Sequence, residues 1–594
     1  PELFAHAKRM NIGDARIAEI FNVPESAVRQ KRKAFGLLPA YKAVDTCAAE
    51  FAAETPYFYS TWHGADEVET SHHEKILVIG SGPIRIGQGI EFDYCSVQAA
   101  LAVKKKGYEA IVINNNPETV STDYAIADRL YFEPLALEDI LNVAEKEGVI
   151  GALVQFGGQT AINVARGLEA AGIRILGTSV AAIEDLEDRD RFYGLLTRLD
   201  IPHIDGAAAR DESELRAHAK RLGFPILVRP SYVIGGQSMV ILSDAEELER
   251  YIAGSNRMSP EWWPLLVDRY VPGIECELDA VCDGEDIFVP GVFEHVEKAG
   301  VHSGDSVAVF PAHTLPEAVV RVLVDYARRI AKAAQLVGLM NIQYVVSGAS
   351  VYVLEVNPRA SRTVPIASKV TGVPMVEWAV AAQLGERLPQ TGLLGSQKCY
   401  AVKAPVFSYE KLNGADPVLG PEMKSTGERL GVAPSLEEAL DKALLAGDDH
   451  PFEPKGSDSV IFAAIAERDQ TAGVPLIRAL SSRGFRIAAT PGTAEILRQN
   501  GVRVAVVVEE ADDFRALFSG GPVQAVINTP RSGRNQATLG YAIRSFALRQ
   551  GIPLFTSLDT AWAMLSLPAG ESRISVSPMK AYREGNAMLK RRSW

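Results

Sequence analysis

Residues 338–362 have the sequence GLMNIQYVVSGASVYVLEVNPRASR, the stretch that decides the predicted fold. Two apolar runs, 340–346 and 351–356, flank a short segment of Ser, Gly and Ala, a pattern that predicts a β-hairpin. Side chains alternate along a strand, so Glu355 and Asn357 share one face. A loop of residues 348–350 would place Gln343 directly opposite Glu355.

The polar residues of this hairpin suit a divalent cation and a phosphate. Gln343, Glu355 and Asn357 would bring a carboxylate and two amide oxygens to one place, with Arg359 and Arg362 just beyond. Hard oxygen ligands suit Mg²⁺ or Mn²⁺, and guanidinium groups suit phosphate. A metal-bound polyphosphate is the economical interpretation. Spacing alone also allows a sheet with a polar solvent face and two surface arginines.

The composition is that of an ordinary globular protein. The chain has 594 residues, of which 47% are hydrophobic and 23% charged, which leaves room for several domains, each with its own core. A net charge of −13 disfavours nucleic acid or an anionic membrane as the main partner. Five cysteines without a C-x-x-C pair predict reduced thiols and a cytoplasmic location.

The sequence predicts neither a membrane span nor a signal peptide. No apolar run approaches the roughly 18 residues that would span a membrane, and no signal peptide is evident. The sequence begins with Pro1 and not Met, so we expect a piece of a longer chain.

Residues 1–70 are predicted to form small helices. Apolar residues recur at helical spacing in 14–21, and Pro24 lies near a helix start. The basic run RQKRK at 29–33 raises the possibility of a DNA-binding helix-turn-helix. A solvated helix face explains so short a charge run better.

Residues 71–188 have the pattern of a doubly wound α/β unit. A buried strand at 75–80 leads into a Gly-rich turn and a helix from about Tyr94. Strands 109–114 and 151–155 end in NNNPET and QFGGQT, polar tips of the kind that bind ligands in such sheets. The glycines at 80, 82, 87 and 89 miss the G-x-G-x-x-G spacing, so we expect a Rossmann-like sheet without NAD.

From residue 189 to 450 the pattern changes. A helix at 191–199 and a strand at 226–229 precede the loop PSYVIGGQ, whose paired glycines could close over phosphates or form an ordinary hairpin turn. Arg229 ends the apolar strand, so a phosphate partner is expected. Strands are predicted at 265–270 and 275–281. His295 and His302 lack zinc-site spacing and are predicted to be hydrogen-bonded polar residues.

A linker composition at 447–458 precedes a separate α/β domain of roughly 140 residues. The hydroxyls of Thr490, Thr493 and Thr529 lie at predicted strand ends, where they could hold an anion or cap turns.

Together these segments resemble the C-terminal half of the large chain of carbamoyl-phosphate synthetase, and the hairpin resembles the metal-binding strand pair of ATP-grasp ligases. The matching stretches are VDTCAAEF (44–51), GSGPIRIGQGIEFDY (80–94), NNNPETVSTDY (115–124), QFGGQT (155–160), VRPSYVIGGQ (228–237), AGVHSGDS (299–306), LEVNPRASRTVP (354–365) and LGPEMKSTGE (419–428). The resemblance implies a multidomain α/β fold. Its expected parts are a helical oligomerisation-type segment (1–70), a Rossmann-like pre-ATP-grasp domain (71–188), an ATP-grasp domain (189–450) and a methylglyoxal-synthase-like allosteric domain (451–594).

The activity implied by the resemblance is phosphorylation of carbamate by ATP to carbamoyl phosphate. This is the last step of carbamoyl phosphate synthesis from bicarbonate and glutamine nitrogen, which feeds pyrimidine and arginine biosynthesis. The implied cofactors are ATP, Mg²⁺ or Mn²⁺, and K⁺. The implied partners are the N-terminal half of the large chain, which this sequence lacks, and a glutamine amidotransferase small subunit. An oligomer is expected, without nucleic acid or membrane.

The family's site residues carry over by motif. The resemblance implies that Arg189 and Arg229 hold ATP phosphates, and that Arg269, Val271 and Glu275, on a strand at 267–275, contact adenine and ribose. It implies nucleotide contacts for Gly300, Val301, His302 and Ser303, and metal binding for Gln343, Glu355 and Asn357, of which Gln343 and Glu355 also contact the nucleotide. The residues implied to act on the transferred phosphoryl group are Asn357, Arg359 and Arg362.

The C-terminal domain matches its family less closely. Thr490, Gly492 and Thr493 match a phosphate-binding turn, but the lysine expected after the next strand is missing and residues 506–510 are VVVEE. Two acidic residues near a phosphate are unfavourable, so nucleotide regulation stays a hypothesis.

Three alternatives compete with this interpretation. They are another ATP-grasp carboxylate or carbamate ligase, such as a biotin-carboxylase-like carboxylase, a regulatory module with a degenerate site, and a nicotinamide dehydrogenase. The GSGPIRIGQGIEFDY and AGVHSGDS stretches argue against the carboxylase, the intact hairpin residues against the degenerate module, and the broken glycine fingerprint against the dehydrogenase.

Overall fold

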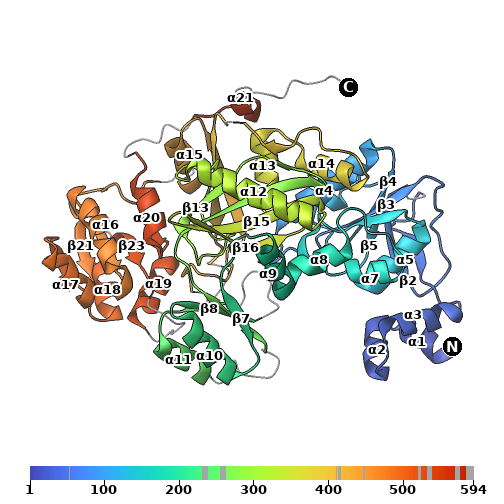
Figure 1. The fold of residues 1–594 in the computed structure, drawn as a ribbon, viewed down its shortest axis with the longest axis horizontal. Coiled ribbons are helices and arrows are strands. Elements are labelled where there is room, and N and C mark those ends of the chain that lie inside the picture. The colour runs from blue at the N-terminus through green and yellow to red at the C-terminus, as the bar shows by residue number, and fades with distance from the viewer. Residues whose placement is uncertain are drawn as a thin grey trace.

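The computed structural model describes residues 1–51, 54–230, 239–254, 263–395, 397–409, 411, 416–445, 449–519, 523–530, 538–568 and 575–583. Four sheets follow one another along the chain, with six, four, nine and five strands. Figure 1 shows the large sheet in the middle, the six-stranded sheet and the N-terminal helices to its right, and the five-stranded sheet to its left. No helix within the described ranges combines the length and apolar character needed to cross a bilayer.

The N-terminal helices are α1 (Glu2–Arg9), α2 (Asp14–Phe21) and α3 (Glu25–Ala34). They dock on α5 (Leu137–Glu147) through a buried ion cluster. Lys8 Nζ lies 3.0 Å from Asp14 Oδ1 and 2.5 Å from Glu138 Oε1, and Arg32 Nε lies 3.0 Å from Asp14 Oδ2. Trp62 covers the two cations, with its ring centre 4.7 Å from Lys8 Nζ. The basic residues of this segment therefore face inward as well as outward, in accord with an intramolecular role.

The prediction that residues 1–70 are helical throughout is wrong beyond Ala34. β1 (Ala40–Ala43) and β2 (Tyr57–Thr61) form an antiparallel pair, and β2 lies parallel to β5 (Arg129–Phe132). The sequence YFYST of β2 is aromatic and β-branched, which favours a strand over a helix. Both strands extend the neighbouring sheet.

The pre-ATP-grasp region is a sheet of order β1-β2-β5-β4-β3-β6, in which β3 to β6 are parallel. Its remaining elements are β3 (Lys75–Ile79), α4 (Ile90–Lys105), β4 (Glu109–Asn114), η1 (Val120–Thr122), β6 (Gly151–Leu153), α6 (Gly158–Ile162), α7 (Ala165–Ala170) and α8 (Val180–Glu187). Helix α4 starts four residues before the expected Tyr94, because Glu91 and Asp93 suit the positive end of a helix. The loops 80–89, 115–124 and 154–160 lie at the carboxyl ends of the strands, as predicted for a doubly wound sheet.

Helix α9 (Arg189–Arg198) leads into a small lobe whose sheet has the order β7-β10-β8-β9. The lobe contains β7 (Gly206–Ala209), α10 (Glu212–Leu222), β8 (Ile226–Pro230), β9 (Val240–Leu242), α11 (Ala245–Ala253) and β10 (Leu265–Arg269). α10 and α11 cover it at the lower edge of Figure 1. The predicted phosphate loop falls at 230–237, and its residues 231–237 lie outside the described ranges.

The central sheet has the order β16-β15-β11-β13-β14-β18-β19, with β12 and β17 beside it. Its strands are β11 (Ile274–Asp283), β12 (Ile287–Val289), β13 (Phe293–Lys298), β14 (Ala308–Phe310), β15 (Val337–Ser347), β16 (Ser350–Asn357), β17 (Gly392–Leu393), β18 (Tyr400–Val406) and β19 (Gly427–Ala433). Its helices are α12 (Glu317–Ala333), α13 (Val364–Thr371), α14 (Met375–Gln383) and α15 (Leu436–Leu444). The two strands predicted at 265–270 and 275–281 are confirmed as β10 and β11. The single strand at 267–275 that the resemblance implied is wrong: β10 and β11 belong to different sheets, since Pro272 and Gly273 interrupt the ladder between them.

The predicted hairpin is present, with a different turn. Ser347 pairs with Ser350, so the turn contains only Gly348 and Ala349, and a bulge at Leu354 restores the register. Gln343 therefore lies opposite Glu355, as the three-residue loop had predicted.

The C-terminal sheet is parallel, with the order β22-β21-β20-β23-β24. Its elements are β20 (Val460–Ala464), η3 (Glu467–Asp469), α16 (Gln470–Ser482), β21 (Arg486–Ala489), α17 (Pro491–Gln499), β22 (Val504–Val507), α18 (Ala511–Ser519), β23 (Val523–Asn528), α19 (Leu539–Arg549), β24 (Leu554–Phe555) and α20 (Leu558–Leu565); α21 (Met579–Arg583) returns to α13.

Two hydrophobic cores cross the domain boundaries. One joins Phe92 and Val103 of α4 to Val376 and Val380 of α14, and another joins the central sheet to the C-terminal sheet. A shared core holds neighbouring domains in one arrangement more firmly than a polar interface does. The positions of site residues from different domains relative to one another therefore depend on these two shared cores.

The ion cluster yields a stability test. Asp14→Ala leaves buried Lys8 and Arg32 with one carboxylate between them, so we expect a loss of about 3 kcal/mol in docking of the helices. Hydrogen exchange of α1–α3 measures it. Glu19→Ala, on the exposed face of α2, is the matched control and should cost under about 0.5 kcal/mol. Equal exchange in the two variants would contradict the cluster's role.

Candidate active site

The hairpin β15–β16 brings three polar side chains to one face of the central sheet. Gln343 pairs with Glu355 across the ladder, and the Asn357 amide donates to Glu355 Oε1 at 3.0 Å. Glu355 is exposed, whereas Gln343 and Asn357 are half-buried. The Gln343 amide donates to Ser303 Oγ at 3.4 Å. The structure thus places the three predicted metal ligands and Ser303 together.

Acidic side chains of β11 continue this face inward. Glu275 and Glu277 are buried, and His295 lies between them, 3.8 Å from Glu275 Oε1 and 3.5 Å from Glu277 Oε1. Burial raises the pKa of Glu275 to about 7, with Glu277 and Glu355 adding to the shift and His295 opposing it. The His295 contact lowers the pKa of Glu277 against the effect of burial. The predicted ribose contact Glu275 therefore belongs to the hairpin cluster.

Asp279, the next acid of β11, fixes the chain that follows the hairpin. Its carboxylate accepts from Ser361 Oγ at 2.6 Å, Thr363 Oγ1 at 2.6 Å and Asn341 Nδ2 at 3.1 Å. Burial raises the pKa of Asp279 to about 7, with Glu277 adding to the shift. These bonds anchor the segment that carries Arg359 and Arg362.

Residues 299–306 pass over the same face. The His302 amide donates to Gly420 O at 2.8 Å, and His302 Nδ1 accepts from the Gly304 amide at 3.0 Å. Lys403, almost fully buried, donates to Ser303 O at 2.7 Å. Burial, followed by the charges of Arg362 and Lys403, lowers the pKa of His302 to about 3. His302 is therefore neutral at physiological pH. As predicted, its side chain is hydrogen-bonded within the protein.

Arg359 is held by its own segment and by the pre-ATP-grasp domain. It donates Nε to Gln159 Oε1 at 3.0 Å, Nη1 to Ala360 O at 3.1 Å and Nη2 to Asn357 Oδ1 at 3.3 Å. Gln155 fixes the backbone beneath it by donating to Pro358 O at 2.8 Å. Arg359 therefore joins the hairpin cluster directly.

Arg362 pairs with carboxylates outside the hairpin. Its Nε lies 2.7 Å from Glu91 Oε1 of α4, and its Nη1 lies 3.9 Å from Glu428 Oε1 of β19. Burial raises the pKa of Glu428, with Lys403 and Arg362 opposing the shift. Arg362 therefore links the pre-ATP-grasp domain to the far strand of the central sheet.

Arg189 and Arg229 form a second cluster in the small lobe. Both face Asp268 of β10: Arg189 pairs with Oδ1, and Arg229 Nε lies 4.0 Å from Oδ2. Burial lowers the pKa of Arg189, and Arg229 adds to the shift. The sequence predicted a phosphate partner for Arg229. The structure places Arg229 near the Asp268 carboxylate, a contact that the sequence did not indicate.

Arg269 and Val271 lie at the link between the lobe and the central sheet. Arg269 is exposed, and Val271 is half-buried in the connection from β10 to β11. Tyr270 donates its hydroxyl to Ala299 O at 2.6 Å, and the Ala299 amide donates to Gly273 O at 3.1 Å. The link thus lies against residues 299–300, so Val271 and Gly300 are in neighbouring segments.

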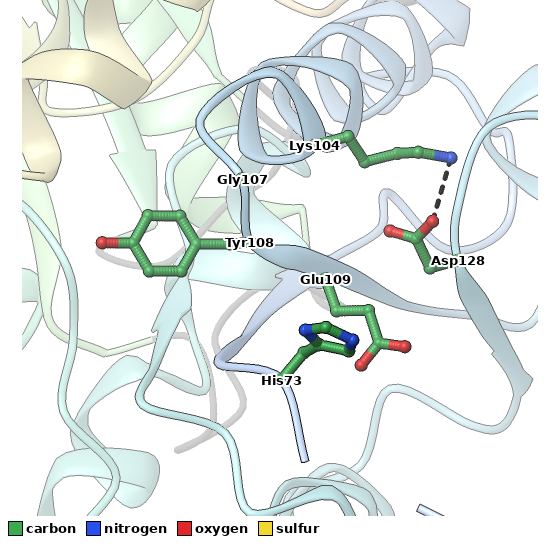
Figure 2. A pocket seen from close by; sticks show the side chains of 6 residues that line it. All are labelled: His73, Lys104, Gly107, Tyr108, Glu109 and Asp128. Atoms are coloured by element: carbon green, nitrogen blue, oxygen red, sulfur yellow. Dashed lines mark ion pairs between the residues drawn. The ribbon is translucent and has the colours of Figure 1, made fainter. Parts of the chain in front are cut away.

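A hollow of about 230 Å³ lies elsewhere, at the amino ends of β3, β4 and β5 (Figure 2). Its lining residues are His73, Lys104, Gly107, Tyr108, Glu109 and Asp128. Lys104 Nζ pairs with Asp128 Oδ1 at 3.2 Å, so the charges largely satisfy one another. Ligand-binding loops of such sheets lie at the opposite edge, so this hollow is not the candidate site.

In the C-terminal domain, two of the three strand-end hydroxyls cap the backbone. Thr493 Oγ1 accepts from the Ile465 amide at 2.9 Å, and Thr529 Oγ1 accepts from the Ala466 amide at 2.8 Å. Thr490 donates to Thr493 Oγ1 at 3.1 Å. These bonds favour the turn-capping interpretation for Thr493 and Thr529.

Comparisons with known families agree with this arrangement. The carbamoyl phosphate synthase preATP-grasp domain matches residues 72–185, and the carbamoyl-phosphate synthase L chain ATP binding domain matches residues 188–391. The MGS-like domain matches residues 472–556. The chain matches one half of a carbamoyl-phosphate synthase large chain. The fold prediction is confirmed, with N-terminal helices, pre-ATP-grasp, ATP-grasp and MGS-like domains in that order.

Two solved structures resemble this chain at low sequence identity over more than half of its length. The biotin carboxylase domain of Hydrogenobacter thermophilus 2-oxoglutarate carboxylase is 21% identical with a TM-score of 0.50, over 62% of this chain and 88% of that one. N5-carboxyaminoimidazole ribonucleotide synthetase from Thermotoga maritima is 19% identical with a TM-score of 0.47, over 63% of this chain and 97% of that one. The first of these shows that the chain shares its fold with a biotin carboxylase domain.

Several residues at the site were missed by the sequence interpretation. They are Gln155, Gln159, Glu91, Asp268, Glu277, Asp279, Lys403 and Glu428. Gln155 and Gln159 carried a signal, since the polar tip QFGGQT follows a strand at the ligand edge of the sheet. Glu91 and Glu428 lie within the quoted stretches 80–94 and 419–428, which gave them no separate role. Glu91 comes from helix α4, and the remaining residues come from strands whose pairing the sequence did not specify.

His302 offers a test based on pH. Its pKa in the folded state lies below the usual value near 6.5, so its contribution to stability is complete above pH 6.5 and is lost as pH falls toward 3. We expect His302→Gln to gain about 2 kcal/mol relative to the unchanged chain between pH 8 and pH 5, because glutamine does not titrate.

Thermal unfolding at the two pH values measures this difference. The same substitution at exposed His63 is the control and should show no such gain. A His302→Gln variant that loses stability at pH 5 as steeply as the unchanged chain would refute a neutral His302.

Proposed function

We propose that this chain transfers the γ-phosphoryl group of ATP to carbamate and forms carbamoyl phosphate and ADP. The observation that supports this most is the joining of Gln343, Glu355, Asn357 and Arg359 on one face of an ATP-binding domain of the carbamoyl-phosphate synthase L chain. A charged metal-nucleotide needs such a set of hard oxygens beside a guanidinium group.

The residues present fit a divalent cation. Gln343 uses its amide nitrogen on Ser303, which leaves its amide oxygen available, and Glu355 is an exposed carboxylate. Oxygen donors of this kind suit Mg²⁺, which keeps water and phosphate oxygens as its remaining ligands. A bound Mg²⁺ would supply positive charge to the phosphate oxygens during transfer. Mn²⁺ is the second candidate, and K⁺ remains a proposal without an assigned site.

The side chains divide the work of phosphoryl transfer. Carbamate oxygen attacks the γ-phosphorus, the bond to the β–γ bridging oxygen breaks, and ADP leaves. Such a reaction needs positioning and charge neutralisation and no covalent protein nucleophile. We assign Arg359 and Arg362 to the transferred phosphoryl group, and Arg189 and Arg229 to the other phosphates. Neutral His302, with Gly300, Val301 and Ser303, would contact the nucleotide without adding charge.

Adenosine would lie at the junction of the lobe and the central sheet. Arg269, Val271 and Glu275 are the residues proposed there, since the link between β10 and β11 packs against residues 299–300. The charge of Glu355 acts on buried Glu275, which connects Glu275 electrostatically to the hairpin cluster.

The relatives are consistent with a carbamate substrate. The Hydrogenobacter domain was solved with MgADP and bicarbonate. Carbamate is bicarbonate with an amino group in place of the hydroxyl, so one type of pocket suits both. Carboxylation of biotin is the competing function, and biotin-dependent ATP hydrolysis would favour it.

The proposed partners are the other half of the large chain and a glutamine amidotransferase subunit, in a cytoplasmic oligomer that serves pyrimidine and arginine synthesis. Nucleotide control through the C-terminal domain is a weaker part of the proposal, because Glu509 and Glu510 stand where the family has a lysine. A null effect of purine and pyrimidine monophosphates on activity would remove it.

The first experiment is ATP formation from MgADP and carbamoyl phosphate by this chain alone. Activity would support substrate, metal and direction together. No ATP, with MgATP still bound, would contradict a complete carbamate site within this chain.

Glu355→Ala tests the site in the same assay. Glu355 is exposed, so we expect an unchanged melting temperature and a fall in ATP formation of more than about 100-fold, since a metal ligand is lost. Glu317→Ala, an exposed glutamate at the start of α12, is the matched control. Full activity in Glu355→Ala would refute the metal assignment.

A further inference from the structure

The motif QFGGQT of the pre-ATP-grasp domain has no role in the function described so far. It follows β6 and enters α6, at the edge of the sheet that faces the ATP-grasp domain. Gly157 packs so closely on the backbone carbonyl of Gly80 that a side chain would collide with it. The motif is therefore held against the sheet, which gives Gln159 a fixed base.

From this base Gln159 reaches two groups of opposite charge. Its Oε1 accepts from Arg359 Nε at 3.0 Å, and its Nε2 donates to Glu187 Oε1 at 2.8 Å and to Asn163 Oδ1 at 3.0 Å. Burial lowers the pKa of Arg359, and the charges of Glu355 and then Glu187 oppose the shift, so Glu187 acts on the guanidinium through space. The neutral amide thus lies between a guanidinium and a carboxylate that would otherwise pair.

The donors of Arg359 show why this matters. A guanidinium has five N–H donors, and Gln159, Ala360 and Asn357 take three of them. Two donors remain for an incoming oxyanion. The Phe92 ring, 5.8 Å from the guanidinium carbon, limits movement on one side. The Arg359 side chain is therefore held in one orientation. Its Nε is hydrogen-bonded to the neutral amide of Gln159 and not to a carboxylate.

We propose that Gln159 is a positioning residue, which aims Arg359 at the transferred phosphoryl group and keeps it from pairing with Glu187. This inference rests on the proposed function. An amide suits the task, since glutamate would neutralise Arg359 and alanine would leave Glu187 free to draw it away.

ATP formation from MgADP and carbamoyl phosphate tests it on the full chain. We expect Gln159→Ala to lower kcat by about 10- to 100-fold, the range for losing a charged hydrogen bond that orients a reacting group. KM for MgADP should stay within about twofold, because Arg359 acts on the phosphoryl group being transferred. Gln30→Ala, an exposed glutamine of α3, is the control.

A double variant separates positioning from structure. Glu187→Gln removes the competing charge, so Gln159→Ala with Glu187→Gln should recover kcat by about tenfold over Gln159→Ala, while Glu187→Gln alone stays near the unchanged chain. No recovery in the double variant, or an unchanged kcat in Gln159→Ala, would overturn the proposal. If the alanine variant misfolds by circular dichroism, Gln159→Glu preserves side-chain volume and should show at least the same loss.

The same assay distinguishes the two levels of inference. An unchanged chain that makes no ATP contradicts the proposed function. An active unchanged chain with an equally active Gln159→Ala variant contradicts only the role of Gln159.

Discussion

The pairing of β15 with two neighbours is the constraint on which the site depends. As an inner strand, β15 places Gln343 opposite Glu277 on one side and Glu355 on the other. A shift by one residue would turn the whole polar set to the other face of the sheet. The ladder therefore fixes Gln343, Glu277 and Glu355 relative to one another without help from loops. Asp279 of the same sheet anchors the segment after the hairpin through Ser361 and Thr363.

The two arginines after the hairpin depend on a different contact, the interface between two domains. Arg359 and Arg362 belong to the ATP-grasp domain, yet Gln159 and Glu91 of the pre-ATP-grasp domain hold them. The shared apolar core of α4 and α14 fixes the distance over which these bonds can form. The pre-ATP-grasp domain is thus part of the site and not only a neighbour of it. The apolar packing between the two domains keeps Gln159 and Glu91 within reach of the two arginines.

Local patterns in the sequence were enough to locate the strands of the hairpin, but not to predict which distant residues contact them. Alternation and the N-P-R motif located the hairpin, but its register was right because a short turn and a bulge at Leu354 offset one another. Residues 40–61 were expected to be helical because neither strand is long enough to show a period. Arg359 and Gln159 are 200 residues apart, and Asp268 gave no local signal, so their contacts follow only from the tertiary fold.

The ion cluster beneath the N-terminal helices also determines when these helices can dock during synthesis of the chain. Asp14 and its partner Glu138 are separated by 124 residues, so the helices leave the ribosome well before the carboxylate that completes their docking. At about 5–20 residues per second this interval is roughly 6–25 s. During this interval the ion cluster lacks Glu138, so the three helices cannot yet dock as they do in the folded protein.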